Sequence, residues 1–110
     1  MSVKKTAKSK RDTEYAKAER AAEFLKALAH QSRLMILCSL AEGEKSVSQL
    51  EEFLVIPQAT VSQQLARLRG NGLVATRRDG KTIYYRLNSE NARAVVGVVY
   101  ELFCGRAGSR

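Results

Sequence analysis

Residues 57–70 read PQATVSQQLARLRG and carry the pattern of an amphipathic helix with an unusual polar face. Pro57, the only proline in the chain, suits the first turn of a helix, and Gly70-Asn71-Gly72 ends it. Val61, Leu65 and Leu68 follow one another at spacings of four and three, which predicts that they face the core. No acidic residue occupies the remaining positions, which are Gln58, Ala59, Thr60, Ser62, Gln63, Gln64, Ala66, Arg67 and Arg69.

This polar face has the side chains that read duplex DNA in the major groove. Glutamine pairs with adenine through two hydrogen bonds, serine and threonine reach bases or phosphates, and arginine binds guanine or the backbone. Because recognition helices usually enter the groove with their N-terminal turns, we expect the first turns to contact bases or nearby phosphates, and Arg67 to contact the backbone. The residues expected in the groove are Gln58, Thr60, Ser62 and Gln63. The alternative interpretation is a solvated polar helix without a partner.

Helices are also expected upstream of this segment, over about residues 13–28, 31–41 and 46–54. Asp12 or Thr13 caps the first of them, and Gly43 ends the second. Ser46 and Gln49 stand three residues apart at the start of the third, as in a capping box. The third helix and the helix after Pro57, joined by a short connection, form the helix-turn-helix pattern.

Alternating hydrophobicity replaces the helical period downstream of Gly72. Residues 73–77 and 81–87 are expected to be strands, and the Asp79-Gly80 pair between them is a strong hairpin signal. The hairpin carries four basic residues, Arg77, Arg78, Lys81 and Arg86, and one acidic residue, Asp79. This positive charge is typical of a DNA-binding wing, with Arg77, Arg78 and Lys81 as the expected contacts. A last helix follows from Asn88 or Ser89 to about Cys104. The expected fold is mainly α with a small β-hairpin, a winged helix-turn-helix in the order α-α-α-α-β-β-α.

The length of 110 residues fits one domain, and 19 Lys and Arg against 11 Asp and Glu favour a polyanionic partner. We expect a disordered basic arm over residues 1–12, the winged-helix domain over 13–104, and a short tail over 105–110. No apolar run is long enough to cross a bilayer, and the N-terminus has no signal-peptide core. We therefore expect a cytoplasmic protein without a membrane partner.

The chain resembles the ArsR/SmtB family of small bacterial repressors from about Ala22 to Phe103. The matching segments, in order, are LKALAHQSRLMIL (25–37), VSQL (47–50), PQATVSQQL (57–65), LRGNGLV (68–74) and RRDGK (77–81). The resemblance implies a homodimer joined through the first and last helices, which binds an operator and releases it when an inducer binds. Many members sense metals, but Val47-Ser48-Gln49 stands where their cysteine pair is expected. The sole histidine, His30, is expected to cap or pack. We expect no metal site and no cofactor.

Cys38 and Cys104 are the only cysteines in the chain. Each alone is typical of a packing or incidental residue. Their placement is similar to that in the reactive-sulfur-sensing branch of the family, which implies that a disulfide or polysulfide joins them and that DNA is then released. The same thiols leave open a peroxide switch or capture of Cu(I) or arsenite. A sequence-tolerant architectural DNA-binding protein is a further alternative, whereas no base or cofactor motif favours an enzyme.

Overall fold

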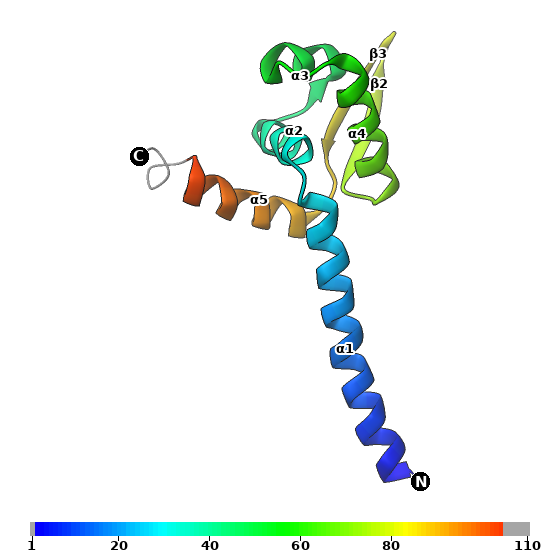
Figure 1. Cartoon of the computed structure of the whole chain (residues 1–110). Helices are drawn as coiled ribbons and strands as arrows, with labels where there is room; N and C mark the ends of the chain where they lie inside the picture. Colours follow the sequence, from blue (N-terminus) through cyan, green and yellow to red (C-terminus); the bar gives the residue numbers. More distant parts are fainter. Residues whose placement is uncertain (1, 105–110) are drawn as a thin grey trace.

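The computed structural model describes residues 2–104, with side chains from residue 12 onward, and its elements follow the expected winged helix-turn-helix order (Figure 1). Within these residues the chain forms five helices and a three-stranded antiparallel sheet. The elements are α1 (Ser2–Leu28), α2 (Gln31–Glu42), β1 (Lys45–Ser46), α3 (Val47–Leu54), α4 (Gln58–Gly70), β2 (Val74–Asp79), β3 (Thr82–Leu87) and α5 (Glu90–Phe103).

Helix α1 begins at Ser2, so the helix start expected at Asp12 or Thr13 is wrong. Residues 2–28 contain neither proline nor glycine, and lysine and alanine, which favour helices, recur throughout. The pairs Glu14–Lys17 and Glu23–Lys26 add ion pairs at i,i+3 spacing, 3.6 and 3.7 Å apart. The helix therefore continues through the segment expected to be a disordered arm. Residues 105–110 lie outside the described part of the chain, and the division into arm, domain and tail stays a prediction.

The core of the domain lies among α2, α3 and α4, and the sheet and the start of α5 close it. Val61, Leu65 and Leu68 are fully buried, which confirms the predicted inward face of α4. Gln64 shares this face and is only 7% exposed, although the sequence pattern placed it with the polar residues. The other buried apolar residues are Leu28, Ile36, Leu37, Leu40, Leu50, Leu73, Val74, Leu87, Ala92 and Val96.

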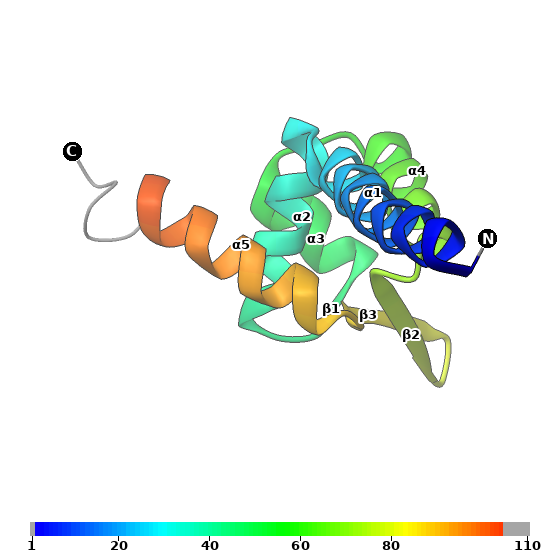
Figure 2. The same ribbon diagram turned by 90° about the horizontal axis from the view of Figure 1, so that it is seen from below.

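The sheet has the strand order β1-β3-β2 and therefore contains one strand more than expected. Strand β1 is only two residues long, too short for any alternating pattern, and pairs Lys45 with Tyr85. In the hairpin Asp79 pairs with Thr82, so the turn is Gly80-Lys81 and Asp79 belongs to β2. Gly80 has φ +67°, as the first turn position of a type II′ hairpin requires. Figure 2 shows the hairpin projecting away from the helices.

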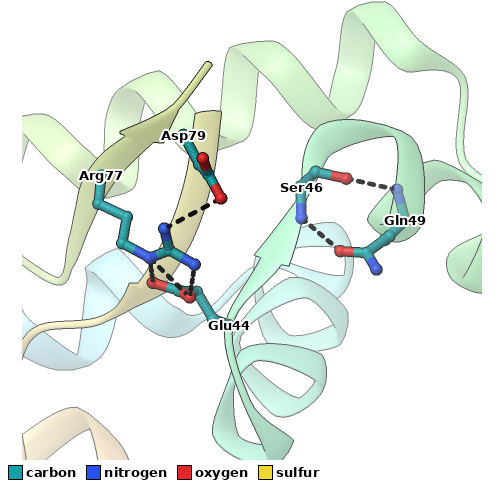
Figure 3. Close-up of polar contacts among 5 residues, drawn as sticks. All are labelled: Glu44, Ser46, Gln49, Arg77 and Asp79. Atoms are coloured by element: carbon teal, nitrogen blue, oxygen red, sulfur yellow. Dashed lines mark hydrogen bonds and ion pairs between the residues drawn. The ribbon is translucent and has the colours of Figure 1, made fainter. Parts of the chain in front are cut away.

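Side-chain caps fix where the helices begin. Ser46 Oγ accepts from Gln49 N at 3.2 Å, and Gln49 Oε1 accepts from Ser46 N at 2.8 Å (Figure 3). This reciprocal pair confirms the predicted capping box of α3. Ser89 caps α5 through the Ala92 amide at 3.0 Å, and Gly43 follows α2 as expected. Strong local signals thus determine the boundaries of the elements that carry the candidate site.

Candidate nucleic-acid interface and thiol pair

The outward face of α4 is a shallow surface with one long polar side chain near its middle. At about 100° per residue, Ala59, Gln63 and Ala66 lie opposite the buried stripe. Ser62 and Arg67 flank them on either side, and both are exposed. Ala59 and Ala66 have small side chains, so Gln63 is the only long side chain at the centre of this face.

The structure keeps most of the predicted DNA-contacting residues of α4 accessible. Gln58, Ser62, Gln63 and Arg67 are exposed, and Thr60 is half-buried at the edge of the face. Pro57 occupies the position before the helix, and no side chain caps the first turn. No acidic residue lies in that turn either, so the positive end of the helix dipole is not offset there.

In the wing, the three predicted phosphate-binding residues differ in their surroundings. Arg78 and Lys81 are exposed, and among the described residues neither forms an ion pair. Arg77 instead contacts Glu44 through Nε (2.8 and 2.9 Å) and Nη2 (2.8 Å), as Figure 3 shows. Asp79 lies 3.9 Å from Arg77 Nη1, and the guanidinium carbon lies 4.7 Å from the centre of the Tyr84 ring.

The Glu44–Arg77 contact shifts the two pKa values in opposite directions, and each shift favours the charged form of the group. The hydrogen bond from Arg77 lowers the pKa of Glu44, and the charge of Arg86 lowers it further. The hydrogen bond to Glu44 raises the pKa of Arg77, so both groups stay charged at neutral pH. Sequence analysis missed Glu44 because it is 33 residues from Arg77 and no local pattern connects the two.

The two cysteines lie beside the same apolar groove, between α2, α3 and the end of α5. Cys38 is half-buried on α2, and Cys104 is exposed at the C-cap of α5. The groove has a volume of about 520 Å³. Burial raises the pKa of the Cys38 thiol, and the charges of Cys104 and Glu42 raise it further. The apolar groove residues are Leu34, Met35, Phe53, Leu54, Val99 and Phe103.

His30 caps helix α2, which is one of the two roles, capping or packing, that the sequence led us to expect. Its Nδ1 accepts a hydrogen bond from Ser32 N at 3.2 Å at the start of α2. Among the side chains that the structure describes, residues 12–104, no three His, Cys, Asp or Glu cluster as a metal site would require. None of the helices described is both long and apolar enough to span a bilayer.

Comparison with known proteins identifies relatives over most of the chain. Residues 30–76 match the family described as bacterial regulatory protein, arsR family. The biofilm growth-associated repressor of Xylella fastidiosa (strain 9a5c) is 47% identical over 90 residues, 82% of this chain and 79% of that protein. The crystal structure of the repressor BigR from X. fastidiosa matches with a TM-score of 0.79 at 45% identity, covering 87% of this chain and 95% of that chain.

Two further solved structures share the fold. Reduced HlyU from Vibrio cholerae N16961 matches with a TM-score of 0.80 at 38% identity, over 84% of this chain and 97% of that one. The homodimeric winged helix-turn-helix DNA-binding domain Mb0332 from Mycobacterium bovis matches with a TM-score of 0.70 at 34% identity, over 83% and 84%. These relatives are transcriptional regulators and not enzymes. The chain belongs to the ArsR family of bacterial regulatory proteins.

Proposed function

We propose that this protein is a cytoplasmic, homodimeric repressor that releases its operator when Cys38 and Cys104 become covalently joined by reactive sulfur. The observation that carries the proposal is that both thiols line one apolar groove between α2 and α5. A bridge between them would fasten the helix that packs on the DNA-reading unit to the last helix of the domain. The biofilm growth-associated repressor, whose name states repression, is a close relative in sequence.

Duplex DNA is the partner that best fits α4 and the hairpin. The outward face of α4 presents Gln63, Ser62 and Arg67 and lacks any acidic side chain. Arg78 and Lys81 add positive charge at the tip of the projecting hairpin (Figure 2). Together they supply base-reading groups on the helix and phosphate-binding groups on the wing.

A second copy of the chain is the partner that fits α1 and α5. Figure 1 shows both helices extending away from the body, and the radius of gyration is 17.6 Å. A compact chain of this length would have a radius of about 13 Å. Large apolar residues remain exposed on both helices, notably Tyr15, Val98 and Leu102. Pairing α1 and α5 with a second copy would bury them, and the Mb0332 relative is described as homodimeric.

The bridging reaction balances with one persulfide, R–S–SH, as the oxidant. The exposed Cys104 thiolate attacks the terminal sulfur of the donor, the donor S–S bond breaks, and R–SH leaves with a proton. Cys38 then attacks Sγ of the Cys104 persulfide, forming the Cys38–Cys104 disulfide and releasing H₂S. Two thiols lose two electrons in total, and the donor is reduced to a thiol and H₂S. Burial raises the pKa of Cys38 and lowers its thiolate fraction, which leaves the exposed Cys104 to attack the donor first; Cys38 loses its proton when it attacks in the second step.

Joining Cys38 to Cys104 would weaken DNA binding by changing the distance between the two α4 helices of the homodimer. In a homodimer the two α4 helices must fit half-sites about one DNA turn apart, so a small displacement affects both contacts. A coupling free energy of about 3 kcal/mol corresponds to roughly a hundredfold loss of affinity. We therefore expect a hundredfold difference between the reduced and bridged protein.

Fluorescence anisotropy with duplex DNA from upstream of the protein's own gene tests this proposal at fixed salt. Protein treated with glutathione persulfide should bind about a hundredfold more weakly than reduced protein, and Cys38→Ser and Cys104→Ser should respond less than twofold. Met35→Leu is the matched control, since it alters the same groove and keeps both thiols. A full response in either serine variant would overturn the thiol switch.

Two further arms separate the alternatives that use the same residues. Peroxide or arsenite in place of persulfide identifies the inducer, and mass spectrometry of the product distinguishes a disulfide from a longer polysulfide. Equal affinity for the upstream duplex and a scrambled duplex would favour an architectural protein over a repressor. A promoter-reporter assay decides the direction of regulation, because the related HlyU of V. cholerae is named a transcriptional activator.

A further inference from the structure

We propose that Arg77 positions the wing through Glu44 and Tyr84 and is not itself a phosphate contact. This inference rests on the proposed DNA binding and assigns Arg77 a different role from Arg78 and Lys81. The three residues Glu44, Arg77 and Tyr84 form the wing-positioning cluster. Of these, only Arg77 was singled out by the sequence pattern, and there as a DNA contact.

The cluster connects the outer strand β2, across the central strand β3, to the residue just before β1. Arg77 on β2 lies directly opposite Tyr84 on β3, and Tyr84 lies opposite Ser46 on β1. Residues directly opposite one another share a face of the sheet, and side chains alternate along each strand. Glu44 lies just before β1, and its hydrogen bonds with Arg77 place its carboxylate on this same face. The guanidinium stacks on the Tyr84 ring and reaches across β3 to the Glu44 carboxylate.

Glu44 is a suitable anchor because the segment around it is held against the end of α2. Lys45 Nζ donates to the Ser39 carbonyl at 2.8 Å, and the Gly43 amide donates to the Leu40 carbonyl at 3.1 Å. The Lys45 side chain is only 11% exposed. The Glu44–Arg77 contact thereby links the wing to α2, the helix that carries Cys38.

The charge of Arg77 is already balanced within the chain, unlike that of its neighbours. Its Nε and Nη2 both contact Glu44, and Asp79 lies 3.9 Å from Nη1. Glu44 occupies Nε and Nη2, so a phosphate could reach Arg77 only through its remaining N–H groups, chiefly those of Nη1, which Asp79 already faces. Arg78 lies on the opposite face of the hairpin, opposite Ile83, and Lys81 lies in the turn. Phosphate binding by the wing is thus assigned to Arg78 and Lys81.

The dependence of operator affinity on salt concentration separates positioning from phosphate binding. Each phosphate contact contributes about 0.9 to the slope of log K against log [salt]. Lys81→Gln, the matched control for loss of one cation, should lower the slope by about one. Arg77→Gln should weaken binding by roughly threefold to tenfold and leave the slope unchanged, since removing a positioning residue changes the wing and not the number of released counterions.

Glu44→Gln should change operator affinity in opposite directions under the two interpretations of Arg77. If Glu44 positions the wing, its loss weakens binding as much as Arg77→Gln, and the double variant is no weaker than either single variant. If Arg77 is a phosphate contact that Glu44 restrains, Glu44→Gln tightens binding. Glu52→Gln, which removes an exposed acid on α3, controls for the change in net charge. Tighter binding by Glu44→Gln, or a lower slope with Arg77→Gln, would overturn the proposal.

Hydrogen exchange and a charge-exchanged pair complete the test. Hydrogen exchange of the β2–β3 amides should accelerate in Glu44→Gln and Arg77→Gln but not in Lys81→Gln. The exchanged pair Glu44→Arg with Arg77→Glu should recover most of the affinity lost in Arg77→Glu alone. Failure of the exchanged pair to recover affinity, in protein whose thermal unfolding matches the parent, would contradict a positioning role.

Discussion

The proposed DNA-reading unit, formed by α3, α4 and the β2–β3 hairpin, and the flank formed by helices α1 and α5 differ in how completely a single chain buries their apolar side chains. In the reading unit, Leu50, Val61, Leu65 and Leu68 are fully buried, and α4 exposes no large apolar side chain, although Phe53 and Val55 are exposed at the end of α3. On the flank, Tyr15 is 75% exposed, Val98 58% and Phe103 70%. Exposed apolar side chains of this size, gathered on two projecting helices, are typical of a surface that another molecule covers.

The difference in burial between the two regions corresponds to the different roles that we propose for them. A reading surface must keep its shape on and off DNA, and a complete core provides that rigidity. In the proposed switch, the thiol site must alter the separation of the two α4 helices of the dimer, so it is best placed where the two subunits are proposed to meet. The thiol groove lies at this boundary, since α2 belongs to the core and the end of α5 belongs to the flank.

Disrupting the proposed dimer surface on α5 should have the largest effect on DNA binding. Val98→Glu places a charge on the exposed face of α5, where a second copy is proposed to pack, and should make the protein monomeric. Losing the second half-site contact should weaken operator binding by a hundredfold or more. Analytical ultracentrifugation and anisotropy measure the two effects, with Arg93→Gln, an exposed residue on a different face of the same helix, as control. A Val98→Glu protein that stays dimeric would remove α5 from the interface.

Breaking the core of the reading unit should mainly affect stability. Leu65→Ala removes a fully buried side chain and should lower the free energy of unfolding by about 2–5 kcal/mol. Tyr15→Ala on the flank, measured in urea at a concentration where the protein is monomeric, should change it by less than about 0.5 kcal/mol. An equal loss of unfolding free energy in Leu65→Ala and Tyr15→Ala would show that α1 packs within its own subunit.

The surface of the reading unit should determine specificity rather than stability. Gln63→Ala should weaken operator binding by about 1–3 kcal/mol and relax the preference at one base pair, because Gln63 is central on the outward face of α4. Arg67→Gln should instead weaken all duplexes alike and lower the salt slope by about one. Competition titrations against single-base operator variants compare the two. An unchanged base preference in Gln63→Ala would assign base reading to other residues.

The smallest expected effect lies in the cap that begins the helix-turn-helix. Ser46→Ala removes the hydroxyl that accepts from the Gln49 amide and should cost about 1 kcal/mol of unfolding free energy. Ser48→Ala, an exposed serine on the same helix, is the control and should be nearly neutral. Urea unfolding monitored by circular dichroism resolves the difference. A neutral Ser46→Ala would mean that packing alone fixes the start of α3.

Local signals allowed most elements of the reading unit to be predicted from sequence. The spacing of Val61, Leu65 and Leu68 predicted the buried face of α4, and Ser46 with Gln49 predicted the start of α3. The hairpin was expected in nearly the right register because glycine at position 80 supplies the positive φ that the turn needs. These features depend on residues within one or two turns of each other, so a single sequence contains them.

The remaining features depend on residues distant in the chain, and only the tertiary structure decides them. Strand β1 forms because β3 offers a free edge to two residues that have no strand pattern of their own. The sequence by itself determined that Arg77 is a cation in a hairpin. The fold decides that Glu44 neutralises it, since the sheet brings together residues 33 positions apart. In the same way Cys38 and Cys104 reach one groove because α2 packs against α5, a contact that no local period encodes.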